Sequence, residues 1–286
     1  MERVSLYIPC YNAKEYINEC LHSVMVQSYK IDEVLVIDDG SDDNTIEIAK
    51  RYPVKIIRHD KNRGLAASRN TAFRVTKNEF VASLDADCVA GHNWLQQLME
   101  CFVSDDIMGV GGKLVERHNL TVADKWRSTH MSQQWGNQIV ENPPFLFGSN
   151  TVFKKKVIEG VGFYNEKFRS NYEDVDISIR IYNSGFRLIY NSEAEVEHLR
   201  KDTIKSVLST YWHWLHYKHM GGNYNNKISR RIAAMLGNIA EYFEISEDFF
   251  QEDLREKTYK LLPIDFLFTF YCAWLDLKQY TRQALL

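Results

Sequence analysis

The sequence predicts an α/β fold, with a Rossmann-like, mostly parallel sheet flanked by helices and followed by a helical C-terminal appendage. Short apolar runs typical of buried strands alternate with segments of helical periodicity from the start of the chain, and the connections are short. Acidic residues stand where two of these strands end, and the alternation stops beyond Asp202. Ligands bind at the carboxyl ends of strands in open α/β sheets, so the acids mark the edge where a functional site is expected.

Composition limits the possible functions. The 286 residues suit one large α/β domain or a domain with an appendage, and 45% hydrophobic and 26% charged residues are ordinary for a globular protein. A net charge of −3 gives no support for a nucleic-acid partner. Five scattered cysteines indicate neither a disulfide framework nor a zinc site. With no signal peptide or membrane-spanning run in view, we expect a cytoplasmic protein, at most peripheral at the inner face of a membrane.

The elements of the first half follow in order. Apolar runs predict strands, and periodic stretches between them predict helices: strands at 4–8, 34–37, 54–58, 80–84 and 108–115, and helices at 15–27, 45–51, 64–75 and 92–103. Asp42 or Asp43 is placed to cap the second helix. Residues 122–139 are mixed and polar, and no element is assigned there. No glycine fingerprint of a dinucleotide or P-loop site is present, which disfavours a dehydrogenase or a P-loop enzyme.

The segment 171–182 carries two periodicities. Strict alternation of apolar and polar residues predicts a strand, at Val175, Ile177, Ile179 and Ile181. The same segment also has a helical stripe, and Gly185 suits a helix end. Periodicity alone favours the strand. Beyond it, two short strands are expected at 186–190 and 194–197, followed by helices at 203–220 and 227–243 and two more before the end of the chain.

Asp85-Ala86-Asp87 directly follows the apolar strand at 80–84. If the strand stays extended through Asp87, the two carboxylates point to the same side. Paired carboxylates at a strand end suit a hard divalent cation such as Mg²⁺ or Mn²⁺. A solvated acidic turn is the alternative for this segment taken alone, so the rest of the chain has to decide.

Five stretches together resemble the family 2 inverting glycosyltransferases, which have the nucleotide-diphosphosugar-binding GT-A fold. They fall in the family's order across about residues 4–200: Ile8-Pro9-x-Tyr11-Asn12, Val36-Ile37-Asp38-Asp39-Gly40-Ser41-x-Asp43-x-Thr45, Asn62-x-Gly64 with Arg69-Asn70, Asp85-x-Asp87, and Glu173-Asp174. The resemblance implies metal-dependent transfer of a sugar from a nucleoside diphosphate sugar, with UDP expected, to a saccharide, lipid-linked or protein acceptor. It also points to surface or extracellular glycan synthesis.

The resemblance assigns donor-binding roles to several of these positions. Asp39 would accept a hydrogen bond from a uracil-like base, and Pro9 and Tyr11 would wall the base pocket, with ordinary packing as the alternative for Tyr11. Arg69 would reach the nucleotide site and hold Asp85 or a phosphate in forked geometry. The segment Gly148-Ser149-Asn150 would line the donor-sugar and acceptor pocket.

The resemblance also implies a Mn²⁺ or Mg²⁺ site. Asp87 would be the direct ligand, with Asp85 nearer the ribose and the waters of the metal. His198 stands just after a strand, where similar enzymes often carry a metal-binding histidine; a structural histidine is the alternative. Lys201 or Arg200 would contact the diphosphate.

Asp174 is expected to be the general base, because inverting transfer is a single displacement that needs one carboxylate to take the acceptor proton. The neighbouring carboxylates of Glu173 and Asp176 would raise its proton affinity by repulsion. In the family this acidic pair opens a helix, where acids at the first turn are favoured by the dipole. We therefore expect a helix here, against the count of alternating residues.

The chain is expected to divide into a nucleotide-sugar-binding half at 1–115, an acceptor and catalytic half at 116–202, and helices at 203–286. His213, His216 and His219 drift around their helix, so packing over the acceptor cleft or in a subunit interface is expected rather than a metal site. The family's processive Gln-x-x-Arg-Trp signature is absent. Core packing is expected for the aromatic run at 266–271, with homo-oligomer or peripheral membrane contact through the C-terminal helices as the alternative.

Two other functions remain open from the sequence. The chain would be a non-catalytic nucleotide-sugar-binding scaffold of the same fold if donor binding occurred without turnover. A phosphodiester-transferring metal enzyme would use the same acids but needs a second ion about 3.5–4 Å from the first. Only Glu173, Asp174 and Asp176 offer further clustered acids for it.

Overall fold

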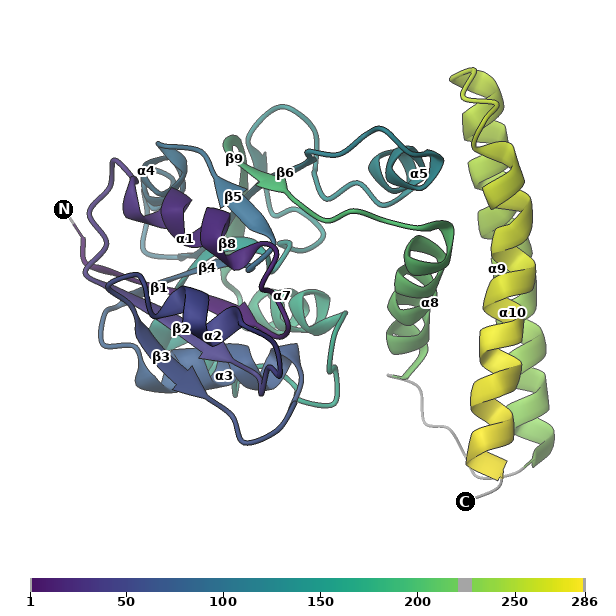
Figure 1. Cartoon of the computed structure of the whole chain (residues 1–286), viewed down its shortest axis with the longest axis horizontal. Coiled ribbons are helices and arrows are strands. Elements are labelled where there is room, and N and C mark those ends of the chain that lie inside the picture. The colour runs from purple at the N-terminus through teal and green to yellow at the C-terminus, as the bar shows by residue number, and fades with distance from the viewer. Residues whose placement is uncertain (1, 221–227, 285–286) are drawn as a thin grey trace. The chain divides into compact units, whose positions relative to one another are not determined.

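The computed structural model describes the backbone of residues 2–220 and 228–284, and the side chains of 2–218 and 234–281 (Figure 1). The chain divides into two compact units, residues 1–117 with 133–200 and residues 118–132 with 201–286. The first unit contains the sheet, and the second is helical. The predicted three-part division remains a prediction.

The described strands form one nine-stranded sheet in the order β3-β2-β1-β4-β8-β6-β9-β5, with β7 pairing to β9. The strands are β1 Val4–Cys10, β2 Glu33–Asp38, β3 Lys55–Arg58, β4 Phe80–Leu84, β5 Cys88–Ala90, β6 Ile107–Glu116, β7 Val140–Glu141, β8 Asn150–Lys154 and β9 Arg187–His198. The first four sheet positions are parallel, as the alternation predicted. β8 is antiparallel to both β4 and β6, β9 is parallel to β6, and β5 and β7 are antiparallel to β9.

Helices cover both faces of this sheet (Figure 1). They are α1 Ile17–Met25, α2 Thr45–Ala49, α3 Leu65–Val75, α4 Trp94–Met99, α6 Lys155–Gly160 and α7 Glu173–Asn183. Alternate side chains of β1 enter different cores: Leu6 and Ile8 pack with α1 and α4, whereas Tyr7 packs with α3 and α7. The carboxyl ends of β1, β2 and β4 therefore meet at one edge, between two packed layers.

Two local predictions need correction, and one unassigned stretch contains a helix. The strand predicted at 80–84 is confirmed, but it does not stay extended through Asp87: β4 ends at Leu84, and Asp85 to Cys88 form a turn closed by a Cys88 N–H bond to Asp85 O of 3.0 Å. The two strands expected at 186–190 and 194–197 are one strand, β9, because a register shift opposite Gly112 absorbs the polar residues between them. Residues 122–139, left unassigned, contain α5 (Val122–His130).

Two helix predictions have mixed outcomes. The segment 173–183 is a helix, so its family-based interpretation is confirmed over its alternating pattern. Asp43 accepts the Thr45 N–H at 3.0 Å at the start of α2, which satisfies one free donor there, although the N-cap position itself belongs to Asn44, whose side chain makes no capping hydrogen bond.

The second unit consists of α5 with α8 (Ile204–Met220), α9 (Ile228–Arg255) and α10 (Leu262–Ala284). α9 and α10 lie side by side (Figure 1), so the segment after residue 227 holds two long helices where three were expected. Thr121 and Asp124 form a capping box that starts α5. Aromatic rings of all four helices make the core, at Trp126, Tyr211, Tyr242, Phe249 and Phe268.

The histidines and aromatic residues of the tail have the following places. His213 Nδ1 lies 2.7 Å from Ser209 O, and His216 stacks on Trp212; the side chain of His219 lies outside the described residues. Of the aromatic run, Phe268 is fully buried, whereas Phe266 and Phe270 are exposed. Core packing thus describes only part of the run, and contact through these helices remains a prediction. Within the described residues, no helix combines the length and the apolar character needed to cross a membrane.

Candidate active site

A cleft of about 200 Å³ opens at the carboxyl ends of β1 and β4. Four of its residues come from the predicted donor site and its metal ligand: Pro9, Tyr11, Asp85 and Asp87. The Tyr11 residue is 49% exposed. The remaining lining residues are Cys10, Asn12, Ala13, Tyr16, Leu65 and Ala86. The cleft thus combines a ring-bearing wall with two carboxylates.

Asp39 is held in place beside the end of β2 by three donors. Its Oδ1 accepts from His59 Nδ1 at 2.7 Å and from the Arg63 N–H at 2.9 Å, and its Oδ2 accepts from the Gly64 N–H at 2.7 Å. Gly64 has φ +99°, and a Cβ there would lie 2.7 Å from Arg169 O, so this approach requires glycine. A carboxylate offers about four acceptor positions, which leaves one for a further donor.

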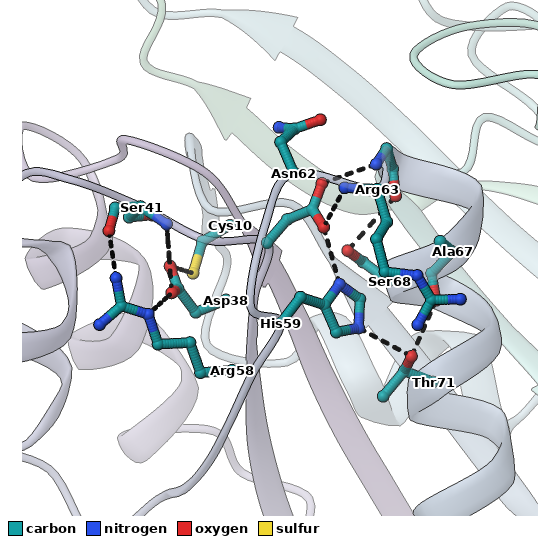
Figure 2. A network of polar contacts seen from close by, with 12 residues as sticks. Cys10, Asp38, Ser41, Arg58, His59, Asn62, Arg63, Ala67, Ser68 and Thr71 are labelled. Atoms are coloured by element: carbon teal, nitrogen blue, oxygen red, sulfur yellow. Dashed lines mark hydrogen bonds and ion pairs between the residues drawn. The ribbon is translucent and has the colours of Figure 1, made fainter.

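Figure 2 shows the two polar groups that flank this strand end. Asp38 is fully buried, accepts the Ser41 N–H at 3.2 Å and pairs with Arg58 Nε at 3.3 Å. His59 lies between α3 and the loop, with Nε2 2.9 Å from Thr71 Oγ1. Of the two consecutive acids, Asp38 therefore braces the loop, and Asp39 is the one whose carboxylate keeps an acceptor position.

Arg69 lies at the centre of the site and is 1% exposed. Its Nη2 pairs with Asp85 Oδ1 at 3.2 Å, and its Nε pairs with Glu173 Oε1 at 3.3 Å. Its Nη1 donates to Ser83 Oγ at 2.7 Å and to Gly148 O at 2.9 Å. Of the two predicted partners, Asp85 or a phosphate, the structure shows Asp85. One guanidinium thus joins β4 and its turn to the start of α7.

Gly148 allows this close packing around Arg69. A Cβ at Gly148 would lie 2.8 Å from Arg69 Nη2 and 3.1 Å from its Cζ. The N–H of Gly148 donates to Asp174 Oδ2 at 3.2 Å, while its carbonyl accepts from Arg69. The glycine therefore links the arginine to the predicted general base.

Asp87 contacts a different partner from Asp85, namely His198 on β9. Its Oδ2 lies 3.2 Å from His198 Nε2, and His198 Nδ1 lies 2.8 Å from Glu116 Oε2. Burial raises the pKa of Asp87, but His198 outweighs it and brings that pKa down to about 2. Burial lowers the pKa of His198, but Asp87 and Glu116 together raise it to about 9. The ring is thus held between two carboxylates.

The residues around this turn fit a divalent cation. Adjacent ligands of an octahedral ion with bonds of about 2.1 Å lie about 3 Å apart, and Asp87 Oδ2 and His198 Nε2 have this spacing. Glu116 Oε1 is buried without a hydrogen-bond partner among the described residues, and Glu116 stands behind the ring as second carboxylate. The carboxylate oxygens suit Mn²⁺ or Mg²⁺, and the imidazole would add one nitrogen ligand.

Glu173 and Asp174 open α7, after Tyr172 in the left-handed region at φ +74°. Asp174 is half-buried and accepts from the Gly148 and Val175 N–H groups at 3.2 and 2.9 Å. Burial raises its pKa. Burial and the charge of Asp174 raise the pKa of Glu173 to about 7, against the lowering effect of Arg69. Both acids thus hold protons more tightly than usual, as a general base requires.

Three further predicted residues have other surroundings. Asn150 is fully buried, and its side chain bonds to Trp94 Nε1, Lys113 O and Ala194 O at 2.6–3.0 Å. The Ser149 hydroxyl donates to Gln133 at 3.4 Å. Lys201 is exposed at the start of the second unit, so its contact with a diphosphate remains a prediction.

Sequence reasoning missed two residues of the site, His59 and Glu116. His59 follows the third strand, and Glu116 ends β6 directly opposite His198 in the sheet register. Both stand at the end of a predicted strand, the signal that identified Asp39 and Asp85. His59 contacts Asp39 and Glu116 contacts His198, and the partners are 20 and 82 positions apart in the sequence. A local sequence pattern does not reveal contacts between residues so far apart.

Comparison with known proteins identifies one family and several similar folds. The sequence model of the family described as "Glycosyl transferase family 2" matches residues 5–162, more than half of the chain. The poly-beta-1,6-N-acetyl-D-glucosamine synthase of Staphylococcus aureus (strain COL) is 25% identical over 231 residues, covering 77% of this chain and 55% of the synthase. The chain therefore spans about half the length of the curated relatives it matches.

Two solved structures have the same fold. The mannosyltransferase PcManGT from Pyrobaculum calidifontis, in complex with GDP-Man and Mn²⁺, has a TM-score of 0.64 at 18% identity, covering 96% of this chain and 87% of that one. GalNAc-T7 with UDP, GalNAc and Mn²⁺ has a TM-score of 0.57 at 17% identity, covering 70% of this chain and 44% of that one. At such identities the likeness concerns the fold alone, and it confirms the predicted GT-A type.

Proposed function

The chain belongs to glycosyl transferase family 2, and from this premise we propose that it is an inverting transferase that moves one sugar from a nucleoside diphosphate donor to an acceptor hydroxyl. One observation carries the proposal: Arg69 contacts both Asp85, in the donor cleft, and Glu173, beside the proposed base. Residues 16 and 104 positions away in sequence are thereby held around a single buried cation. Such an arrangement orients a donor and a base toward each other.

The donor would lie in the cleft between β1 and β4. Asp39 keeps one acceptor position, which suits the N–H of uracil and equally that of guanine. Pro9 and Tyr11 offer a wall for the base, since both line the cleft. The resemblance favours a uridine donor, whereas PcManGT was solved with GDP-Man, so both donors belong in the assay.

Asp87 and His198 would hold Mn²⁺ or Mg²⁺, with Asp85 beside them. When bound, the ion would neutralise the charge that develops on the leaving nucleoside diphosphate. Asp85 is fixed by Arg69 and Asp87 by His198, so the two carboxylates are oriented before any ligand arrives. Prior orientation reduces the reorganisation needed during transfer.

Asp174 would take the proton of the acceptor hydroxyl as its oxygen attacks the sugar. The N–H groups of Gly148 and Val175 fix the orientation of its carboxylate. Asp176, two residues further along α7, pairs with Arg180 at 2.6 Å and does not join the acid pair. That pairing also removes Asp176 from the second metal site that a phosphodiester-transferring enzyme would need.

The test is sugar transfer by Asp174→Asn with UDP- and GDP-sugars in the presence of Mn²⁺. Loss of a general base is expected to slow transfer by about 10²–10⁴-fold. Donor-induced thermal stabilisation should stay at the wild-type level, because Asp174 does not line the donor cleft. Asp176→Asn is the matched control on the same helix and should keep most activity. Unchanged turnover by Asp174→Asn would exclude it as the base, and donor binding without any turnover in the wild type would instead indicate a binding protein.

A further inference from the structure

The helical unit buries a second cluster of ionisable side chains, outside the donor site. His130 at the end of α5, Asp253 near the end of α9 and Asp265 at the start of α10 converge, and all three side chains are 0% exposed. His130 Nε2 lies 3.2 Å from Asp253 Oδ2 and 3.8 Å from Asp265 Oδ1. Potential ligand atoms of the three residues lie within 4.8 Å of one another.

Each carboxylate of this cluster has one oxygen held by a neutral donor. Thr258 Oγ1 donates to Asp253 Oδ1 at 2.5 Å, and Trp126 Nε1 donates to Asp265 Oδ1 at 2.7 Å. Asp265 Oδ2 is buried and has no hydrogen-bond partner in the part of the chain that the structure describes. An orphaned carboxylate oxygen in a core is costly unless something positive meets it.

The surroundings of His130 resemble the outer shell of a metal-binding imidazole. Its Nδ1 has no hydrogen-bond partner within the described side chains, and Glu252 Oε2 lies 3.4 Å away at the partly exposed edge. A histidine that binds a metal through one ring nitrogen usually donates the N–H of the other to a carboxylate, which orients the ring and raises its basicity. The carboxylate of Glu252 is the group positioned to accept from His130 Nδ1.

We propose that His130, Asp253 and Asp265 form a structural binding site for a divalent transition-metal ion, with zinc as the best match. Ligands of tetrahedral zinc at about 2.0–2.2 Å lie about 3.3–3.6 Å apart, which is close to the two separations from His130 Nε2. All three side chains are fully buried, so neither several waters nor phosphate oxygens complete the shell that Ca²⁺ and Mg²⁺ require, and the set of one imidazole and two carboxylates disfavours both ions here.

The ion would link segments that lie far apart in the sequence. His130 comes from the segment 118–132, and the two aspartates come from the C-terminal helices. Two buried carboxylates and one imidazole also leave excess negative charge, which a divalent cation would offset. Its role would be to fasten α5 to α9 and α10, because metal-binding energy adds directly to folding energy where the ligands are brought together only on folding.

The experiment uses the full chain, purified without chelator from zinc-supplemented culture. Elemental analysis should find about one zinc ion per chain, retained by Asp87→Asn and lost by Asp265→Asn. Adding Zn²⁺ to chelator-treated wild type should raise Tm by about 5 °C. Asp276→Asn is the matched control: Asp276 is also buried on α10 and also accepts a Trp Nε1 at 2.7 Å, from Trp212. It should lower stability yet keep the zinc response.

A second measurement covers the case in which Asp265→Asn does not fold. Wild type loaded with Co²⁺ should develop the visible absorption of a low-coordinate cobalt site, and X-ray absorption should report one imidazole with oxygen ligands. Zinc content below about 0.1 per chain together with an unchanged Tm would overturn the proposal and leave protons as the only neutralising charge. Zinc retained equally by Asp265→Asn and Asp276→Asn would also overturn it, since the ion would then lie elsewhere.

Discussion

Glu173→Gln tests whether the buried acid beside the proposed base holds a proton near neutral pH. Glu173 is 3% exposed, its Oε1 pairs with Arg69 Nε at 3.3 Å, and its Oε2 is buried with no hydrogen-bond partner among the described residues. Burial and the charge of Asp174 raise its pKa from 4.5 to about 7, although Arg69 opposes this. Glutamine keeps the shape of the side chain and removes its ionisation.

The sign follows from proton binding. Between pH 4.5 and about 7 the folded protein holds a proton at Glu173 that the unfolded chain has released. Its contribution to stability is therefore fully present below pH 4.5 and declines as pH rises through the folded pKa. A difference of this size corresponds to on the order of 3 kcal/mol. Between pH 4.5 and 8, the free energy of unfolding of wild type should therefore fall by this amount more than that of the glutamine variant.

Urea unfolding of wild type and Glu173→Gln at pH 4.5, 6 and 8 measures the difference directly. Comparing the two proteins at each pH cancels the titration of all other groups. Glu159→Gln, an exposed substitution on α6, is the matched control and should follow wild type. If the free energies of unfolding of wild type and Glu173→Gln fall in parallel, Glu173 is ionised throughout and Arg69 outweighs its burial.

Three further substitutions test the site. At pH 8, where Glu173 is ionised, Arg69→Met leaves the buried carboxylates of Asp85 and Glu173 without their cation and should cost about 3–5 kcal/mol; a loss below about 1 kcal/mol in urea unfolding at that pH would contradict this. Gly148→Ala pushes a Cβ to 2.8 Å from Arg69 Nη2 and should lower kcat, whereas Gly160→Ala, with nothing within 4 Å, should leave it unchanged. His59→Ala removes one of three donors to Asp39 and should weaken nucleotide binding about tenfold, measured by calorimetry; wild-type affinity would show that Asp39 is held by its two backbone donors alone.

Much of the sheet could be predicted because its evidence is local. The apolar runs, and the polar residues that end them, locate the boundaries of β1 to β4 within a few residues. The preference for right-handed connections between parallel strands then limits the order of these strands in the sheet. The fold class is confirmed, and so is the helix at 173–183. That helix shows the limit of periodicity, because its outward-facing Ile179 is 43% exposed and its alternation is incidental. The acidic first turn and Gly185 carried the better signal.

What could not be predicted depends on contacts between distant segments. Asn150 has the residue type of a ligand-binding group, yet it is bonded within the core to three different strands and helices. Glu116 and His59 have ordinary local surroundings and gain their roles only through β9 and β2. These contacts join segments that are distant in the sequence, so local sequence patterns do not predict them.

The correction at Asp85 and Asp87 changes the interpretation of this acid pair. An extended strand would have given both carboxylates the same neighbours, and their repulsion would then raise both pKa values. The turn instead gives the two carboxylates different partners: Asp85 accepts a hydrogen bond from Arg69, and Asp87 contacts His198. Burial outweighs Arg69 and raises the pKa of Asp85, whereas His198 outweighs burial and lowers that of Asp87 to about 2. Asp87, the proposed direct metal ligand, is thus the acid that the protein keeps ionised, and Asp85 is the acid that it fixes in place.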